Sequence, residues 1–247
     1  MTRMNGWQAL VRGLESEDIG PVFGLPGSPG QFYDALYDSS LKSVLVRHET
    51  SGGFMAMAWA RVTNQPAVAF GCPGPGVANL VPAVLEAYSG CTPMLVLGVR
   101  ASTQTDGMGA FQETDHIGMM KPITKWAATI NRVDRTDWYL RRALSICKSG
   151  QPGPVYLEFP SDIGLEQFDF DSYVHAPEAI RPAPDPERIQ QAVDLIKGAH
   201  RPLIVCGGGS ILSGAGPALQ SFVDAFGIPV QTTPAGRGII GENHPLY

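Results

Sequence analysis

The chain has 247 residues, of which 44% are apolar and 17% are charged, a composition that is sufficient for a packed core. Its net charge is -5, and lysine and arginine form no cluster with interleaved aromatic residues, which argues against a nucleic-acid or anionic membrane surface. No apolar run approaches the roughly 20 residues that span a bilayer, and the first residues lack the pattern of a secretion signal. We therefore expect a globular, cytoplasmic protein.

The cysteines and histidines are scattered along the sequence. Cys72, Cys91, Cys147 and Cys206 have no paired spacing of the kind that zinc sites and redox dithiols use. The histidines likewise form no ligand pattern. We expect reduced cysteines and no metal site built by this chain alone.

Short apolar runs alternate with helical patterns through the first two thirds of the chain. Strands are predicted at 21–25, 44–46, 67–70, 93–97, 126–130 and 154–159, and helices at 7–14, 31–38, from 50, from 77 and at 134–147. The run 44–46 has the length and branching of a buried strand. Strands that alternate with helices are typical of a parallel sheet covered on both faces.

The loops after the predicted strands are the first candidates for a site. Proline and glycine dominate residues 26–30 and 73–76, which keeps both loops rigid and nearly free of side chains. A third loop, 98–122, is long, and loops of this length are more often functional than not. Glu49 lies where a strand hands over to a helix, the position at which ligands bind in α/β sheets. A carboxylate is also favoured there by the helix dipole alone.

The last third of the chain reads differently. Residues 164–186 are irregular and rich in proline, which predicts an extended linker. A helix at 187–197, a strand at 202–206, a tight turn at 207–209, a helix at 217–226 and a strand at 228–232 then form one βαβ unit. A two-stranded sheet is marginal in isolation, so we expect an incomplete domain that a longer chain or another polypeptide completes.

Five segments resemble thiamine diphosphate-dependent enzymes of the acetolactate synthase-like group. They are VFGLPGSPG (22–30), VRHETSGGFMAMAWAR (46–61), PGPGVANLV (73–81), GAFQETDHIGMMKPITK (109–125) and QPGPVYLEFPSDI (151–163). The resemblance implies a three-layer, flavodoxin-like pyrimidine-binding domain over 1–165. It further implies a linker over 166–186 and the start of a Rossmann-like central domain over 187–247.

The resemblance also assigns roles to residues. In this family a glutamate at the position of Glu49 hydrogen-bonds the cofactor's aminopyrimidine and so helps to deprotonate the thiazolium C2 carbon. A glutamine at the position of Gln112 faces the same reacting end of the cofactor. The residues implied for cofactor binding are Pro26, Gly27, Glu49, Pro73, Gly74, Gly76 and Asn79, and those for the substrate pocket are Ser28, Phe111, Gln112 and His116. Four of these residues have a simpler alternative: a helix cap for Asn79, a rigid turn for Ser28, a core position for Phe111, and a surface or satisfied position for His116.

The reaction that the resemblance implies is decarboxylation of a 2-keto acid and transfer of the resulting enamine to an acceptor. One alternative is a CoA-ester decarboxylase or lyase of the oxalyl-CoA decarboxylase type, because Lys121-Pro122 resembles the corresponding segment of those enzymes. The other is a non-catalytic pyrimidine-domain binding protein. In this family Mg²⁺ is held by a C-terminal domain with a Gly-Asp-Gly motif, which this sequence lacks. A third interpretation takes Gly207–Gly209 as a contact for FAD or a CoA portion, which some members of the family bind on the central domain. A homo- or hetero-oligomer is implied, because the two cofactor-binding domains usually lie on different subunits.

Overall fold

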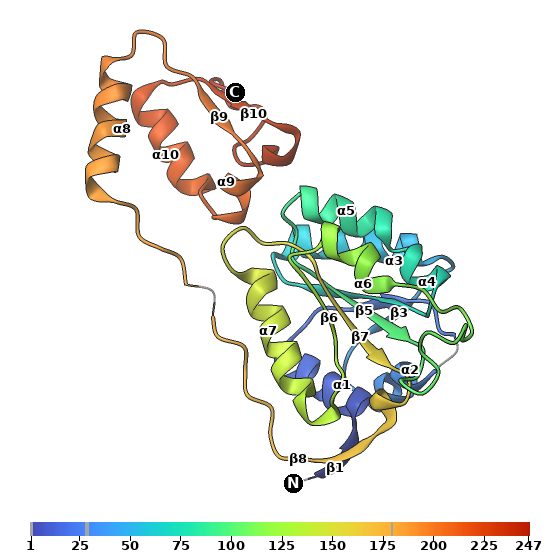
Figure 1. Ribbon diagram of the computed structural model, residues 1–247. Coiled ribbons are helices and arrows are strands. Elements are labelled where there is room, and N and C mark those ends of the chain that lie inside the picture. The colour runs from blue at the N-terminus through green and yellow to red at the C-terminus, as the bar shows by residue number, and fades with distance from the viewer. Residues whose placement is uncertain (1, 28–29, 179) are drawn as a thin grey trace. The chain divides into compact units, whose positions relative to one another are not determined.

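The computed structural model describes residues 2–27, 30–178 and 180–247. The chain divides into two compact units, residues 1–180 and residues 181–247. Figure 1 shows the helices and strands of both units. Among the described helices, none combines the length and the apolar character that a membrane crossing requires.

The first unit is built on a parallel sheet of six strands. They are β2 (Val22–Gly24), β3 (Ser43–Leu45), β4 (Ala67–Gly71), β5 (Met94–Arg100), β6 (Trp126–Thr129) and β7 (Val155–Pro160). Their order across the sheet is β3-β2-β4-β5-β7-β6, and every neighbouring pair is parallel. The sequence prediction of a parallel α/β sheet is confirmed.

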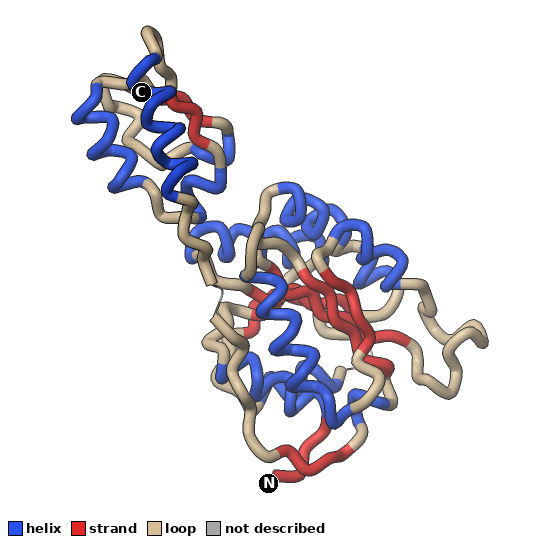
Figure 2. The backbone as a smooth tube through the Cα atoms, turned by 60° about the vertical axis from the view of Figure 1, so that its left-hand side comes forward, coloured by secondary structure: helices blue, strands red, loops and turns tan. Residues whose placement is uncertain are grey.

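Helices cover both faces of this sheet and give three layers (Figure 2). One face carries α1 (Gly6–Ser16), α2 (Gln31–Tyr37) and α7 (Thr136–Lys148), and the other α3 (Glu49–Thr63), α5 (Val81–Ser89) and α6 (His116–Met120). Side chains of β4 alternate between the two cores, because successive residues of a strand point to opposite faces. Val68 and Phe70 pack in the first core, whereas Ala67 and Ala69 pack in the second.

Two parts of the first unit differ from the sequence prediction. The strand at 44–46 is not buried as a whole, because β3 is an edge strand and leaves Leu45 65% exposed. In addition, β1 (Thr2–Asn5) and β8 (Gln167–Phe170) form an antiparallel pair that was not predicted. Part of the range expected to be a linker is therefore a strand, because its partner lies at the other end of this unit and four residues taken alone carry no signal of that pairing.

The helix predicted from residue 77 is divided into two. α4 (Pro75–Ala78) ends before α5 begins at Val81, and Asn79 lies in the break. Proline at position 82 has no N–H to donate to the carbonyl of Ala78, so a continuous helix would lack that hydrogen bond. Because of this break, Asn79 is not part of a continuous helix face, and its side chain can contact Glu49.

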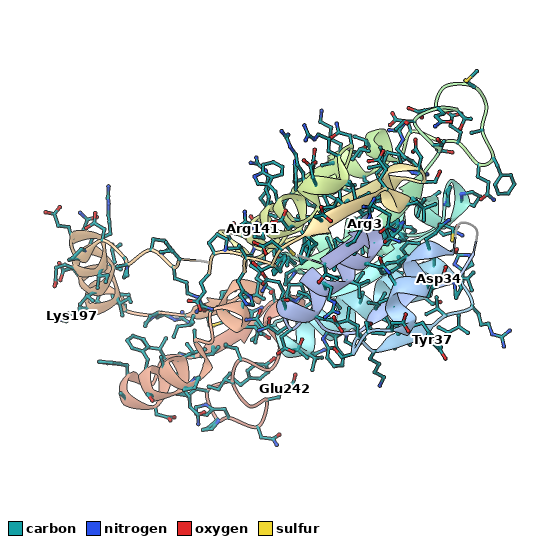
Figure 3. All side chains as sticks on the ribbon, turned by 90° about the horizontal axis from the view of Figure 1, so that it is seen from below. Arg3, Asp34, Tyr37, Arg141, Lys197 and Glu242 are labelled. Atoms are coloured by element: carbon teal, nitrogen blue, oxygen red, sulfur yellow. The ribbon has the colours of Figure 1, made fainter. Side chains whose placement is uncertain are left out.

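The second unit is the predicted βαβ unit. It comprises α8 (Pro186–Gly198), β9 (Ile204–Cys206), α9 (Gly208–Leu212), α10 (Gly216–Phe226) and β10 (Val230–Thr232), with β9 and β10 parallel. The tight turn expected at 207–209 is wrong, since Gly207 is the N-cap of α9. No residue of α8, which carries the surface residue Lys197 labelled in Figure 3, is buried in this unit, and Leu195 is 76% exposed.

Single turns of 3-10 helix complete the description. They are η1 (Lys121–Ile123), η2 (Val133–Arg135), η3 (Ile163–Leu165) and η4 (Pro234–Gly236). The first three shape the connections of the parallel sheet, and η4 follows β10 in the second unit.

Candidate active site

The strand order places two loops side by side at one edge of the sheet. The chain runs from β2 outward to β3 and then returns to β4 on the other side of β2. Such a reversal brings the loops after β2 and β4 together at the carboxyl ends of these two strands, which is the place where ligands of doubly wound sheets bind. A Cβ atom on Gly27 would lie 2.7 Å from the sulfur of Cys72, so the loops after β2 and β4 contact each other. Pro26 and Gly27 are exposed beside this contact, and Ser28 lies outside the described residues.

Glu49, the first residue of α3, lies beside the loop after β4. Its N-cap is His48, whose Nδ1 accepts the Thr50 N–H at 3.3 Å. The Glu49 side chain is buried, at 8% exposure, and its Oε2 accepts a hydrogen bond of 3.0 Å from the amide Nδ2 of Asn79. The Thr50 hydroxyl in turn donates to the main-chain carbonyl of Asn79. These two hydrogen bonds join the start of α3 to the break between α4 and α5. The bond from Asn79 also fixes Oε2 of the Glu49 carboxylate.

The glycines after β4 let the backbone pass close to this carboxylate. A Cβ atom on Gly71 would lie 2.7 Å from the carbonyl oxygen of Gly76, and one on Gly76 would lie 3.4 Å from Glu49 Oε1. Gly74 has φ +62° and would place a Cβ atom 2.7 Å from the carbonyl oxygen of Gln112. Only glycine meets both demands at this last position. Pro73, Gly74 and Gly76 are all buried in the loop.

The second oxygen of Glu49 is available to a ligand. Oε1 has no hydrogen-bond partner among the residues that the structure describes, and Gly76 leaves the space beside it without a side chain. A buried carboxylate with one fixed and one unpartnered oxygen suits a ring nitrogen that shares a proton with it. The residues present therefore fit the aminopyrimidine of thiamine diphosphate.

Two further polar side chains surround the carboxylate, and sequence reasoning missed both. The Tyr33 hydroxyl on α2 is buried and has no hydrogen-bond partner among the described residues. Burial raises the pKa of this hydroxyl, and the neighbouring Cys72 and Glu49 raise it further. Burial, followed by the charge of Glu49, also raises the pKa of the Cys72 thiol. Both groups are thus proton-bearing neighbours of Glu49, and the only sequence signal was their position beside the two loops.

The long loop is shorter in the structure than predicted and extends over 101–115. Glu113 orders one turn of this loop, because its carboxylate accepts hydrogen bonds from the N–H groups of Gly107, Gly109 and Ala110. Phe111 is 77% exposed, and Gln112, with φ +55°, is exposed with its backbone against Gly74. The loop therefore contacts the glycine loop after β4 through main-chain atoms.

His116, at the start of α6, is 2% exposed and does not lie in an open crevice. Its Nε2 accepts the Gly74 N–H at 2.8 Å, and its Nδ1 lies 3.0 Å from Oε2 of Glu158 on β7. These contacts match the alternative of a histidine that is satisfied within the protein. Glu158 was not predicted as a site residue, although a charged residue inside the apolar run Val155–Pro160 was a signal for one.

The fold and the site define a doubly wound α/β domain with a buried acid at its switch point. The family comparison agrees with this class. The model of the thiamine pyrophosphate enzyme N-terminal TPP binding domain matches residues 4–119, and the model of the thiamine pyrophosphate enzyme central domain matches residues 189–247. The chain belongs to the thiamine pyrophosphate enzymes.

Curated relatives are similar over nearly the whole chain. A probable acetolactate synthase large subunit of Methanococcus aeolicus is 38% identical over 98% of this chain and 42% of its own length. The acetolactate synthase large subunit of Corynebacterium glutamicum is 35% identical over 99% of the chain and 40% of its own length. Acetolactate synthase isozyme 2 large subunit of Escherichia coli is 31% identical, with 99% and 44% covered. The chain thus spans about two fifths of the length of these relatives.

Proposed function

We propose that this chain supplies the pyrimidine-binding part of a thiamine diphosphate-dependent carboligase. The enzyme would remove CO₂ from a 2-keto acid and join the remaining fragment to a second carbonyl compound, as the names of the acetolactate synthase relatives imply. The observation that carries this proposal is the buried Glu49 carboxylate, fixed by Asn79 and open beside Gly76. Thiamine diphosphate, when bound, supplies the nucleophilic carbon for such reactions.

The residues of this chain would bind and orient the cofactor's ring. Glu49 Oε1 would share a proton with a ring nitrogen, while Asn79 holds Oε2 in place. The buried backbone of Pro73, Gly74 and Gly76 would lie against the flat ring, and Pro26 and Gly27 would close its other side. Because Glu49 is buried, water competes little for its free oxygen.

The loop 101–115 would present the substrate-facing groups. Gln112 and Phe111 are exposed on this loop, next to the glycine loop that would hold the cofactor. They would contact the keto acid after a further domain covers this face, and the resemblance assigns Ser28, which lies outside the described residues, to the same pocket. His116 would act from beneath the site through the main chain of Gly74.

A second protein part completes the proposed enzyme. The Mg²⁺ ion and the diphosphate would be held by a domain outside this chain, in the same or another subunit of a cytoplasmic oligomer. The first unit would bind the pyrimidine and the second would begin the central domain. FAD or a CoA portion, where the full enzyme binds one, would contact the second unit at Gly207–Gly209, where α9 begins.

The test is turnover by the full enzyme that carries this chain. With thiamine diphosphate and Mg²⁺, we expect CO₂ release from pyruvate and formation of acetolactate, both lost when thiamine diphosphate is omitted. Oxalyl-CoA is offered in parallel, and its preferential turnover would replace the proposal with the CoA-ester alternative. Failure to bind thiamine diphosphate at all would leave the non-catalytic binding protein.

A further inference from the structure

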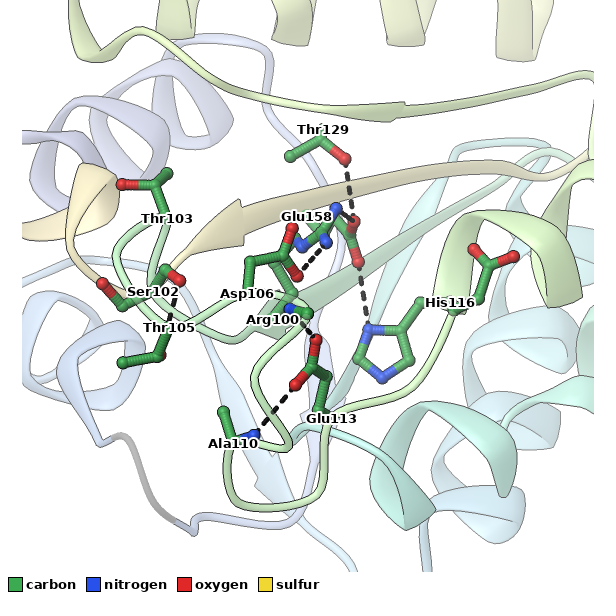
Figure 4. A network of polar contacts seen from close by, with 12 residues as sticks. Arg100, Ser102, Thr103, Thr105, Asp106, Ala110, Glu113, His116, Thr129 and Glu158 are labelled. Carbon is green, nitrogen blue, oxygen red and sulfur yellow. Dashed lines mark hydrogen bonds and ion pairs between the residues drawn. The ribbon is translucent and has the colours of Figure 1, made fainter.

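A buried carboxylate, Glu158, is the centre of a polar network beneath the candidate site (Figure 4). It lies on β7, the strand next to the edge strand β6, and is 2% exposed. Its Oε2 accepts from the Tyr156 hydroxyl at 2.8 Å, and its Oε1 accepts from the Thr129 hydroxyl at 2.8 Å. Arg100 Nη1 lies 3.6 Å from the same Oε1. A carboxylate this far from water persists only with such partners, so each of them is energetically significant.

His116 connects Glu158 to the glycine loop. The Gly74 N–H can only donate, so Nε2 of His116, 2.8 Å away, must present its lone pair. The ring proton then lies on Nδ1 and is donated to Glu158 Oε2 at 3.0 Å. These two contacts select one neutral tautomer of the imidazole. The position of Gly74, and with it the loop beside Glu49, is thereby tied to Glu158.

Arg100 connects Glu158 to the loop 101–115. Its guanidinium forms an ion pair with Asp106 of that loop, in addition to its approach to Glu158. Asp106 directly precedes Gly107, the first of the residues whose N–H groups donate to Glu113. The Arg100–Asp106 ion pair therefore anchors the turn that leads into Phe111 and Gln112. One carboxylate thus reaches two loops of the site, through His116 on one side and Arg100 on the other.

We propose that His116 and Arg100 are positioning residues. Through their shared partner Glu158 they hold the glycine loop 73–76 and the loop 101–115 in fixed positions relative to each other, an arrangement called here their register. In the proposed site both residues would act through the protein, His116 through the Gly74 N–H and Arg100 through Asp106, without contacting substrate or cofactor. The meaning of this register for catalysis rests on the proposed function, but the coupling itself is a property of the chain. Both loops belong to the face on which cofactor and substrate would meet, so loss of this register would move the substrate-facing loop 101–115 away from the glycine loop that would hold the cofactor.

Amide hydrogen exchange of the protein tests the coupling without turnover. His116→Phe keeps a flat ring but removes the acceptor for the Gly74 N–H, so exchange in residues 72–78 should rise about tenfold. Arg100→Met should raise exchange in 101–115 by a similar factor and leave 72–78 nearly unchanged. Glu158→Gln should raise both, since one amide oxygen cannot replace the two oxygens that accept from His116, Thr129 and Tyr156, and the neutral side chain loses its ion pair with Arg100. Arg132→Met, which cuts an exposed ion pair with Asp134, is the matched control and should change neither loop.

Unchanged exchange of 72–78 in His116→Phe, or an effect of Glu158→Gln on only one loop, would overturn the proposal. Because buried variants can unfold, the tautomer of the unmodified protein is a second test. Its ¹⁵N NMR spectrum at pH 7 should show a protonated Nδ1 and an unprotonated Nε2 for His116, and the opposite tautomer would refute the network.

Activity separates this proposal from the proposed function. In the full enzyme, His116→Phe should weaken thiamine diphosphate binding about tenfold, whereas Arg100→Met should lower kcat about tenfold at unchanged cofactor affinity. Arg100→Lys should restore part of that kcat, because it keeps a cation between the two carboxylates. If the exchange results hold but the enzyme does not use thiamine diphosphate, only the proposed function fails.

Discussion

Replacement of Glu49 by glutamine is the most direct test of the site. Glutamine keeps the size of the side chain, and its amide oxygen can still accept from Asn79 at the observed 3.0 Å. What is lost is the negative charge and the ability to share a proton with a ring nitrogen. General acid–base participation of this kind contributes about 10²–10⁴ in rate, so kcat should fall by that factor. This corresponds to about 3–5 kcal/mol in transition-state stabilisation.

The same substitution should have little effect on the fold. A hydrogen bond to a charged group stabilises by about 1.5–3 kcal/mol and a neutral one by about 0.5–1.5 kcal/mol, so the Asn79 contact weakens by about 1 kcal/mol. Loss of the charge at the N-terminus of α3 costs about 0.3–1 kcal/mol more. Relief of the burial of a carboxylate that is only 8% exposed opposes both effects. The net change should stay within about 1 kcal/mol, or about 2–4 °C in Tm.

The assay combines steady-state decarboxylation of pyruvate by the full enzyme with thermal unfolding of the same preparation. Glu86→Gln is the matched control, since Glu86 pairs with Arg61 at 3.3 Å on the surface and its side chain is 53% exposed. This control should retain its activity and change in stability by no more than about 0.5 kcal/mol. Undiminished kcat in Glu49→Gln, with a folded protein, would refute the assignment of Glu49.

Two further predictions follow from the surroundings of Glu49. Gly71→Ala should destabilise the protein by about 1–3 kcal/mol in thermal or urea unfolding, because its Cβ would lie 2.7 Å from a backbone oxygen. The control Gly209→Ala, with open space around it, should be neutral, and equal stability of the two variants would contradict the close packing of the loop. Cys72 should reach half-maximal alkylation by iodoacetamide above the ordinary thiol pKa of about 8.5, because burial and then Glu49 disfavour the thiolate. Glu49→Gln should lower that pH, and an unchanged pH profile would place Cys72 outside the influence of Glu49.

The sequence by itself determined the elements and much of the site. The period of the apolar runs gave the alternating strands and helices, because periodicity is a local property of the chain. The proline and glycine loops and the placement of Glu49 at the start of a helix were also readable locally, and α3 begins at that residue. The resemblance added the roles of residues such as Asn79, whose bond to Glu49 the structure contains.

Only the tertiary structure decided how these pieces meet. The edge position of β3 exposes Leu45, although its apolar run predicted burial. The pairing of β1 with β8 and the contacts among Arg100, His116 and Glu158 join segments far apart in the chain. Such contacts depend on strand order, which the periodicity of a segment does not encode, because the same apolar pattern fits a central strand or an edge strand. The neighbourhood of a charged residue inside a strand therefore became visible only when the sheet was assembled.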